Sequence, residues 1–264
     1  MTTGFDVAWL ARIEDAGIHA TAPREQRWID GWLVRFAPGK AKRARCIQPV
    51  ASGRLSIDEK LALCLPHFAA AGLPPIVRIT PFAEPAGLDA HLATLGMVRF
   101  DDSLVMVLAA LDDELEGRDD GHREGEAVSI EAVGLAAFAD CIGAARGSSA
   151  VERATHADRL GHAAVPHHAV LARDRRGAVL AGGQVAVEGT LAGLYDIFTV
   201  TDARGRGHGE RVSRHLLAHG RRLGASAAYL QVDAGNDVAR RLYRRLGFRA
   251  AYPYHYRAPA TPAR

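Results

Sequence analysis

The sequence contains few cysteines and no long apolar run. Its 264 residues include three cysteines, Cys46, Cys64 and Cys141, which lie far apart and form no Cys-x-x-Cys pair. Separated thiols in odd number argue against a disulfide framework and predict a reducing compartment. No stretch of about 18 apolar residues occurs, which predicts that no segment spans a membrane. The N-terminus lacks the basic start and apolar core of a signal peptide, so we expect a cytoplasmic protein.

Several common chemical motifs are also missing. No Gly-Lys-Ser/Thr follows a glycine-rich loop, which excludes a Walker A phosphate site. The glycines do not follow the Gly-x-Gly-x-x-Gly pattern of dinucleotide-binding folds. Neither His-Glu-x-x-His nor Cys/His zinc spacing is present, although His162, His167 and His168 lie close together in the sequence. We therefore expect no bound metal.

Lysine is scarce, and most of the basic residues are arginines. The formal net charge is +3 and the isoelectric point about 8.9, a mild excess that suits an anionic cofactor or substrate. Arginines gather in two helical stretches near the C-terminus and leave nucleic-acid binding as an alternative, but the low net charge and the lack of an aromatic platform argue against a nucleic-acid partner. These are Arg211, Arg214, Arg221, Arg222, Arg240, Arg241, Arg244 and Arg245.

The pattern of apolar segments predicts an α/β fold with a mixed sheet. Residues 112–126 are charged and almost free of apolar side chains, so we expect a linker there between domains 1–111 and 127–264. After the linker the sequence predicts strands at 168–173, 179–188, 191–200 and 226–233, and helices at 210–224 and 237–246. At the C-terminus it predicts two paired strands, 248–251 and 254–256.

The first half repeats part of this plan. It is expected to contain helices at 61–71 and 88–95, with strands at 76–80 and 103–111. Residues 92–97 (LATLGM) resemble residues 243–248 (YRRLGF) at an offset of 151 positions. This self-similarity favours a duplicated domain over the chance recurrence of a helix, a glycine and an apolar residue.

Residues 204–209 (RGRGHG) carry the strongest local signal. Three glycines alternate with larger residues where a strand gives way to a helix. Glycine permits positive φ and close approach of a ligand, and the start of a helix offers unpaired N–H groups and a positive dipole end. Together these features predict a phosphate or pyrophosphate site, while a flexible loop is the simpler alternative.

The stretch 199–248 resembles the GNAT superfamily of N-acetyltransferases. The superfamily's pyrophosphate loop, Gln/Arg-x-x-Gly-x-Gly/Ala, is matched by Arg204, Gly207 and Gly209. Its second signature is an Asn followed by a helix with Ala-x-x-Leu-Tyr-x-x-x-Gly-Phe. This is matched by Asn236, Ala239, Leu242, Tyr243, Gly247 and Phe248. The resemblance covers about 60 residues closely and extends over 127–258, and it implies two tandem GNAT-like domains of which the first is degenerate.

The resemblance implies a site for acetyl-CoA, bound without a metal. It also implies that the strand at 191–200 diverges from the strand at 226–233 and exposes backbone groups to the pantetheine arm, with an N–H near 197–199 facing the oxyanion. The cofactor-binding residues expected on this basis are Phe198, Thr199, Val200, Arg204, Gly205, Arg206, Gly207, His208, Gly209 and Asn236. Alternatively, His208 is simply an exposed residue at the start of its helix. Asn236 is also expected to cap its helix.

Direct acyl transfer requires a neutral amine, donors for the oxyanion and a proton for the thiolate. We expect Tyr243 to be the general acid, since a phenol remains protonated at neutral pH and the family often uses this position so. A core tyrosine is the alternative. Asp196 is the first candidate for the general base and Glu188 the second, although a solvated or ion-paired carboxylate would explain either residue.

The first half lacks this machinery. Leu92 stands where the repeat would place Tyr243, and no glycine-rich loop precedes the helix at 61–71. We expect this half to complete the fold or to form a wall of the acceptor site. Its basic stretch suits an anionic acceptor or a solvated face; the residues are Arg35, Lys40, Lys42, Arg43 and Arg45. Two interpretations are also open for Tyr254, His255 and Tyr256: they line the acceptor pocket, or they belong to a strand on the surface.

The predicted function is therefore transfer of acetyl from acetyl-CoA to a primary amine by direct attack in a ternary complex. The acceptor is a small-molecule amine or a protein amine, and both a monomer and a homodimer fit the sequence. A non-catalytic acyl-CoA-binding or regulatory module is the alternative, against which the complete Tyr243 motif argues.

Overall fold

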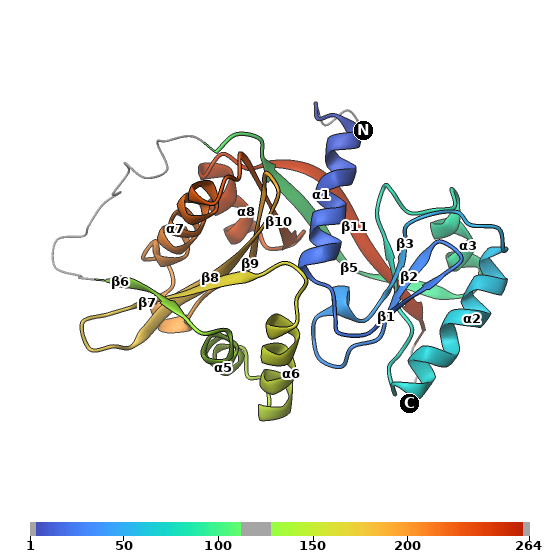
Figure 1. The fold of residues 1–264 in the computed structure, drawn as a ribbon, viewed down its shortest axis with the longest axis horizontal. Helices are drawn as coiled ribbons and strands as arrows, with labels where there is room; N and C mark the ends of the chain where they lie inside the picture. Colours follow the sequence, from blue (N-terminus) through green and yellow to red (C-terminus); the bar gives the residue numbers. More distant parts are fainter. Residues whose placement is uncertain (1–3, 112–127, 261–264) are drawn as a thin grey trace.

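The computed structural model describes residues 4–111 and 128–260. The strands in these ranges form one eleven-stranded mixed sheet, in the order β1-β2-β3-β4-β11-β5-β10-β9-β8-β7-β6 (Figure 1). The first half contributes α1 (Val7–Ala20), β1 (Gln26–Ile29), β2 (Trp32–Arg35), η1 (Lys42–Ala44), β3 (Ile47–Pro49), α2 (Ile57–Ala70), β4 (Val77–Ile79), α3 (Leu88–Thr94) and β5 (Met97–Leu108). The second half contributes β6 (Ser129–Val133), α5 (Leu135–Ala145), α6 (Ala150–Gly161), β7 (His167–Arg173), β8 (Val179–Glu188), β9 (Leu191–Thr199), η2 (Thr201–Ala203), α7 (His208–Arg222), β10 (Ala227–Asp233), α8 (Asp237–Arg245) and β11 (Arg249–Pro259).

Each half contains the same strand plan. In the first half, antiparallel strands β1 to β3 are followed by β4, which lies parallel to β3. In the second half, antiparallel strands β6 to β9 are followed by β10, which lies parallel to β9. A parallel neighbour needs a crossover connection, which α2 supplies in the first half and α7 in the second. The fold is thus the mixed α/β arrangement that the sequence predicted, with two similar units.

The last strand of each half crosses to the other half. Strand β5 pairs with β10 of the second half, over Ser103–Leu108, whereas β11 pairs with β4 of the first half. The exchanged strands also pair with each other along most of their length. Each half therefore provides a neighbour for a strand that would otherwise be an open sheet edge in the other half, and the two units share one sheet.

Helices cover both faces of this sheet (Figure 1). Apolar residues of α7 and α8 pack against strands β7 to β10 and β5 in one core cluster, and α5 and α6 form another with β7 and β9. Helices α2 and α3 pack on β2 to β4. Helix α1 packs with strands of both halves, and its Glu14 accepts hydrogen bonds from Arg78 on β4 and from Tyr252 on β11.

Local sequence signals explain several helix starts. Ser56 with Glu59 and Ser149 with Glu152 form capping boxes at α2 and α6. The expectation that Asn236 caps the last helix is confirmed, because its side chain accepts a hydrogen bond from the Ala239 N–H at 3.0 Å. Because these caps satisfy N–H groups that would otherwise lack partners, they fix where each helix begins.

The structure corrects the expectation for the C-terminus. Residues 248–251 and 254–256 are not a pair of strands but parts of the single strand β11, with register shifts between Ala250 and Tyr252 and between Tyr254 and Tyr256. These irregularities bend the strand, which allows it to follow β5 across the whole junction. The expected linker lies within 112–127, outside the described residues, so the domain limits remain a prediction. In the described part of the chain, no helix is long and apolar enough to cross a membrane.

Candidate functional site

A bulge in β9 turns Asp196 out of the regular strand. Gly182 pairs with Phe198 and Gln184 with Tyr195, so Gly183 alone lies opposite two residues of β9. Asp196 has a φ of 51°, in the left-handed region that aspartate tolerates better than most residues. A Cβ on Gly183, opposite the bulge, would lie 2.3 Å from a methyl carbon of Ile197, so a larger residue there would displace this side chain. The bulge therefore re-aims one carboxylate without breaking the strand.

The same strand separates from its parallel neighbour at this point. The pairing of β9 with β10 runs from Leu191–Ala227 to Leu194–Leu230 and ends there. Beyond it lies a cavity of about 330 Å³, to which Tyr195 and Asp196 contribute from β9 and Gln231 and Asp233 from β10. The divergence implied by the family resemblance is thus present, and the cavity lies in the gap.

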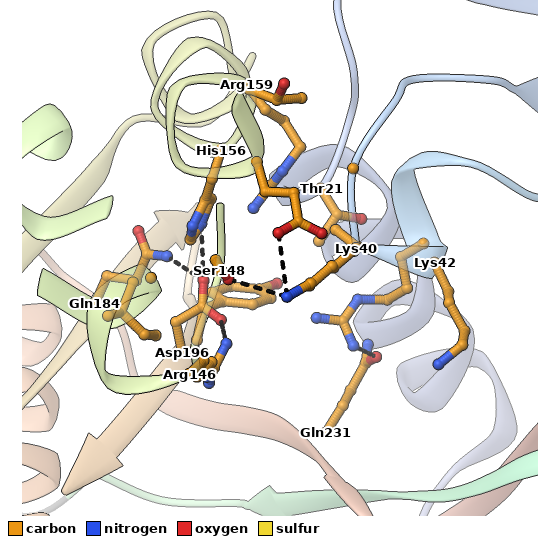
Figure 2. A pocket seen from close by; sticks show the side chains of 18 of the residues that line it. Thr21, Lys40, Lys42, Arg146, Ser148, His156, Arg159, Gln184, Asp196 and Gln231 are labelled. Atoms are coloured by element: carbon orange, nitrogen blue, oxygen red, sulfur yellow. Dashed lines mark hydrogen bonds and ion pairs between the residues drawn. The ribbon is translucent and has the colours of Figure 1, made fainter. Parts of the chain in front are cut away.

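Three side chains hold the Asp196 carboxylate (Figure 2). Arg146 from the end of α5 donates to Oδ1 at 3.0 Å, Gln184 donates to Oδ2 at 2.8 Å, and His156 Nε2 from α6 lies 3.1 Å from Oδ2. Burial alone would raise the pKa of Asp196, but the contact with His156 and the charges of Arg146 and Arg159 outweigh it and hold the pKa well below its usual range. Asp196 is therefore an ionised carboxylate, and by itself a weak proton acceptor.

The first half supplies the opposite wall of the cavity. Lys40, Lys42 and Arg43 line it, together with Asp101 on β5. Asp101 has a φ of 58°, and it too lies in a bulge, where β5 has two residues opposite His255 of β11. Lys42 pairs with Asp101 at 2.9 Å. Lys42 and Arg43 are half-buried in this wall, so a solvated face is the wrong explanation for them, whereas Lys40 is exposed and a solvated face still fits it.

The remaining residues of the basic stretch have other positions. Arg35 is buried and donates from Nη2 to the Ile18 carbonyl at 2.8 Å, and Arg45 is half-buried outside the cavity lining. The surface-strand explanation for the Tyr254–Tyr256 segment is also wrong. Tyr254 and Tyr256 are buried and line the cavity, while His255 points elsewhere and contacts Asp89 at 2.9 Å.

The glycine-rich loop lies at the start of α7, as expected. Gly205 and Gly207 have φ values of 76° and 83°, and Gly207 occupies the N-cap position. No atom lies within 4 Å of a Cβ built on either residue, so the loop is open on that side. Arg204 and Arg206 are exposed. The loop thus presents backbone N–H groups and positive charge to an open space.

Two other residues of the loop have restricted surroundings. His208 is only 3% exposed, so the alternative of an exposed residue at the helix start is wrong. A Cβ on Gly209 would lie 3.2 Å from Thr199 Oγ1 and 3.5 Å from Leu242 Cδ1. The end of β9, the start of α7 and the middle of α8 therefore meet at Gly209, and a larger side chain would force them apart.

At the end of β9, successive backbone N–H groups point alternately towards β8 and towards the gap. The Val200 N–H donates to the Leu180 carbonyl at 3.0 Å, so Val200 faces β8 and does not offer that N–H to a ligand. Successive residues of a strand alternate in direction, so Thr199 turns its N–H away from β8, towards the gap. Phe198 is buried against Phe138 of α5, with ring centroids 6.1 Å apart.

Tyr243 lies on α8 and not in the 330 Å³ cavity lining. It is 8% exposed, packs edge-on against Phe248, and burial raises its pKa to about 12. Leu242, the preceding residue of α8, approaches the glycine-rich loop at Gly209, so this turn of α8 lies beside the loop. Glu188 also lies outside the cavity lining and contacts His19 Nδ1 at 2.8 Å.

Sequence reasoning missed the residues that surround Asp196. Arg146, His156, Arg159 and Gln184 come from α5, α6 and β8, and the sequence analysis assigned no helix to the segment that holds the first three. The Ser149-x-x-Glu152 pattern is a helix-start signal that would have located α6. Within the described residues, no group of three or more His, Cys, Asp or Glu side chains is arranged to hold a metal ion.

A parallel strand pair that opens beside a glycine-rich helix start, followed by the Asn236–Phe248 signature, defines the chain as an N-acetyltransferase of the GNAT type. Comparison with known proteins agrees. A family model described as "Probable histone acetyltransferase Rv0428c C-terminal" matches residues 8–257, and the chain belongs to this family.

Individual relatives are more distant. The chain is 26% identical over 242 residues to the uncharacterized N-acetyltransferase YobR of Bacillus subtilis, covering 88% of this chain and 91% of that protein. Among solved structures, a GCN5-related N-acetyltransferase from Kribbella flavida has a TM-score of 0.64 at 19% identity and covers 95% of each chain. A tandem GNAT protein from the clavulanic acid biosynthesis pathway has a TM-score of 0.60 at 15% identity, covering 80% of this chain and 73% of that one. These structures share the fold.

The lowered pKa of Asp196 generates a pH-dependent prediction. The folded-state pKa lies well below the unfolded value of about 3.9, so the carboxylate's contribution to stability is complete above the unfolded pKa and is lost progressively as the pH falls from there through the folded pKa. Asp196→Asn is expected to lower the free energy of unfolding by ~2 kcal/mol at pH 7. The loss relative to the wild type should be about 1 kcal/mol smaller at pH 3.

Urea unfolding of both proteins at the two pH values measures this difference. Asp202→Asn, at an exposed position of η2, is the matched control and should change stability little at either pH. An Asp196→Asn loss that is the same at pH 3 and pH 7 would contradict the assignment of a cation-stabilised carboxylate.

Proposed function

We propose that the protein transfers the acetyl group of acetyl-CoA to a primary amine by direct attack within a ternary complex. One observation carries the proposal: the gap between β9 and β10 begins at Leu194 and Leu230, and the strand on its rim leads into the open loop 204–209. Pantetheine in the gap and pyrophosphate on the loop would place the thioester beside the cavity that contains Asp196.

In this proposal the pyrophosphate binds to the backbone N–H groups of residues 205–209. The N–H groups of a helix's first turn have no intrahelical acceptor and point along the positive end of the dipole. Arg204 and Arg206 add charge at the surface of the loop. The buried position of His208 leaves its backbone, not its imidazole, to contribute. Asn236, whose carbonyl oxygen caps α8, presents its remaining amide N–H donors at the same end of the helix.

Thr199 supplies backbone contacts to the pantetheine arm, and Phe198 and Val200 hold the strand end in place. Phe198 packs on α5, and Val200 is fixed by its hydrogen bond to β8. An N–H of the bulged segment, near residues 197–199, donates to the carbonyl oxygen that becomes the oxyanion. Because the bulge is held by the Asp196 contacts, this donor is positioned before the substrate binds.

Tyr243 provides the proton for the departing thiolate. A phenol whose pKa is about 12 remains protonated throughout the neutral range, so it is a donor in the resting enzyme. The amine's proton leaves towards Asp196 and His156. The imidazole lies 3.1 Å from the carboxylate, which gives a proton arriving on the ring a stabilising negative charge.

The proposal also assigns roles to the two units, a class of acceptor and a cellular location. The catalytic unit is residues 127–264, and the unit 1–111 provides an acceptor wall without a cofactor loop of its own. The family description names histones, which would make the acceptor a lysine amine of a protein, and a small amine is the other class. Three free thiols, two of them buried, suit a protein that works in the cytoplasm.

Gly207→Glu is expected to abolish acetyl-CoA binding. The new side chain would put bulk and negative charge at the pyrophosphate position, and calorimetric titration with acetyl-CoA measures the result. A non-glycine residue at positive φ also costs about 1–2 kcal/mol of stability, which must be separated from the effect on binding.

Gly224→Glu is the matched control. Gly224 follows the other end of α7, has a φ of 96°, is exposed and has no atom within 4 Å of a built Cβ. The two substitutions share backbone strain and added charge, so only their positions differ. Equal acetyl-CoA affinity in the two variants would refute the cofactor assignment of the loop.

Tyr243→Phe is expected to reduce kcat by about 10²-fold or more while the KM for acetyl-CoA changes little, because the ring packing is kept and only the proton donor is lost. Steady-state kinetics with saturating amine measures both constants. Tyr252→Phe removes another buried phenol, one bonded to Glu14 and remote from the loop, and should leave kcat near the wild-type value. An unchanged kcat in Tyr243→Phe would remove Tyr243 from the mechanism.

A further inference from the structure

The charges that line the cavity do not balance locally. Three of its cations have carboxylate partners: Lys40 with Glu152 at 3.3 Å, Lys42 with Asp101 at 2.9 Å, and Arg146 with Asp196 at 3.0 Å. The two other cations of the lining are Arg43 and Arg159. Each belongs to a different half of the chain.

Arg43 enters the cavity from η1 and makes only neutral contacts. Its Nη1 donates to Gln231 Oε1 and, at 3.4 Å, to the Tyr254 hydroxyl, and its Nε is buried without a hydrogen-bond partner. Within the described residues it has no carboxylate within ion-pair distance. A guanidinium held in this way keeps its charge but has nothing to neutralise it.

Arg159 approaches from the other side. Figure 2 shows its side chain extending from α6 into the cavity, near Thr21 and His156. Over residues 4–111 and 128–260, no hydrogen bond or ion pair is found for its guanidinium. Burial lowers the pKa of Arg159; the charge of Asp196 opposes this effect, and the charge of Arg43 adds to it. The cavity is thus lined by two arginines, one from each half, and no carboxylate within the described residues forms an ion pair with either.

A protein keeps partly buried, unneutralised charges of one sign at a cost in stability, and a ligand of opposite charge recovers that cost. Arginine pairs suit planar or tetrahedral oxygen anions in particular, because each guanidinium presents N–H donors in a fixed fork. Asp233 is the remaining carboxylate of the lining. It accepts a hydrogen bond from the Gly235 N–H at 2.7 Å and forms no ion pair with Arg43 or Arg159.

We propose that the acceptor is an amine that also carries an anionic oxygen group, a carboxylate or a phosphate, and that Arg43 and Arg159 bind this group from the two halves of the chain. The inference rests on the proposed function, since it names the substrate class of the same site. A lysine-rich peptide is the opposite class, because its additional positive charges would face this pair.

The test uses matched amines as probes with the intact chain. The carboxylate arm is a panel of amino acids, each compared with its own amide, and the phosphate arm compares O-phosphoethanolamine with ethanolamine. A lysine-rich peptide is the third probe. CoA release gives kcat/KM for each amine, corrected for the neutral fraction of its amino group. Calorimetry of the same amines in the presence of CoA gives their binding independently of turnover.

We expect the amines of one anionic arm to exceed their neutral partners by about tenfold or more in kcat/KM and in affinity, because a charge-assisted contact is strong in a shielded site. The arm that responds identifies the carboxylate or the phosphate. The proposal would be overturned if every neutral amine had a kcat/KM equal to or higher than that of its anionic partner, or if the lysine-rich peptide were the preferred acceptor. Selective binding without any transfer would support it and would instead contradict the proposed transferase reaction.

Variants at Arg159 assign the effect to this residue. Arg159→Gln should reduce the ratio between the anionic and neutral amines at least tenfold, and Arg159→Lys should restore part of it because the charge remains. Arg175→Gln, on the exposed turn between β7 and β8, is the control for loss of an arginine elsewhere. The unfolding midpoint of Arg159→Gln should not fall, since an unpaired charge is removed; a lower midpoint with an unchanged ratio would make Arg159 structural and overturn its assignment.

Discussion

The exchange of β5 and β11 is the constraint on which the rest of the structure depends. Each strand completes the sheet of the other half, so neither unit has a finished sheet without its neighbour. The buried Arg78–Glu14 ion pair lies within the first half, and β11 contacts it across the same junction: Tyr252 donates a hydrogen bond to Glu14, and the Arg78 guanidinium lies 4.1 Å from the Tyr254 ring centroid. Buried ion pairs of this kind stabilise little by themselves but are costly to break, so the two tyrosines of β11 pack against a fixed pair.

That fixed junction explains how a half without a cofactor loop takes part in the site. Strand β5 carries Asp101 to the cavity, and η1 presents Lys42 and Arg43 on the same side. Across the gap, the β9 bulge presents Asp196, and α6 contributes His156 and Arg159. In the proposed function the second half would carry out the transfer, and both halves would contact the acceptor.

The parts of this picture that could be predicted from the sequence are those encoded locally. The alternating glycines at 205–209, the Asn236 cap and the helix ending at Gly247 each depend on residues a few positions apart, and each lies where it was predicted. The repeat was visible because helix, glycine and strand recur at a constant offset. The strand exchange could not be predicted, because β5 and β11 have the same apolar pattern whichever neighbour they pair with. Asp196 was chosen for its strand position, but its partners Arg146 and His156 lie 50 and 40 residues earlier, on helices that only the tertiary fold brings to it.

The central claim is that a CoA thioester lies in the β9–β10 gap with its diphosphate on the loop at the start of α7. A crystal structure of the protein with acetyl-CoA tests it most directly. The account predicts phosphate oxygens within hydrogen-bond distance of the backbone N–H groups of residues 205–209, and the thioester carbonyl beside the bulge at Asp196. A cofactor bound elsewhere, or a thioester directed away from the cavity shared by the two halves, would contradict it.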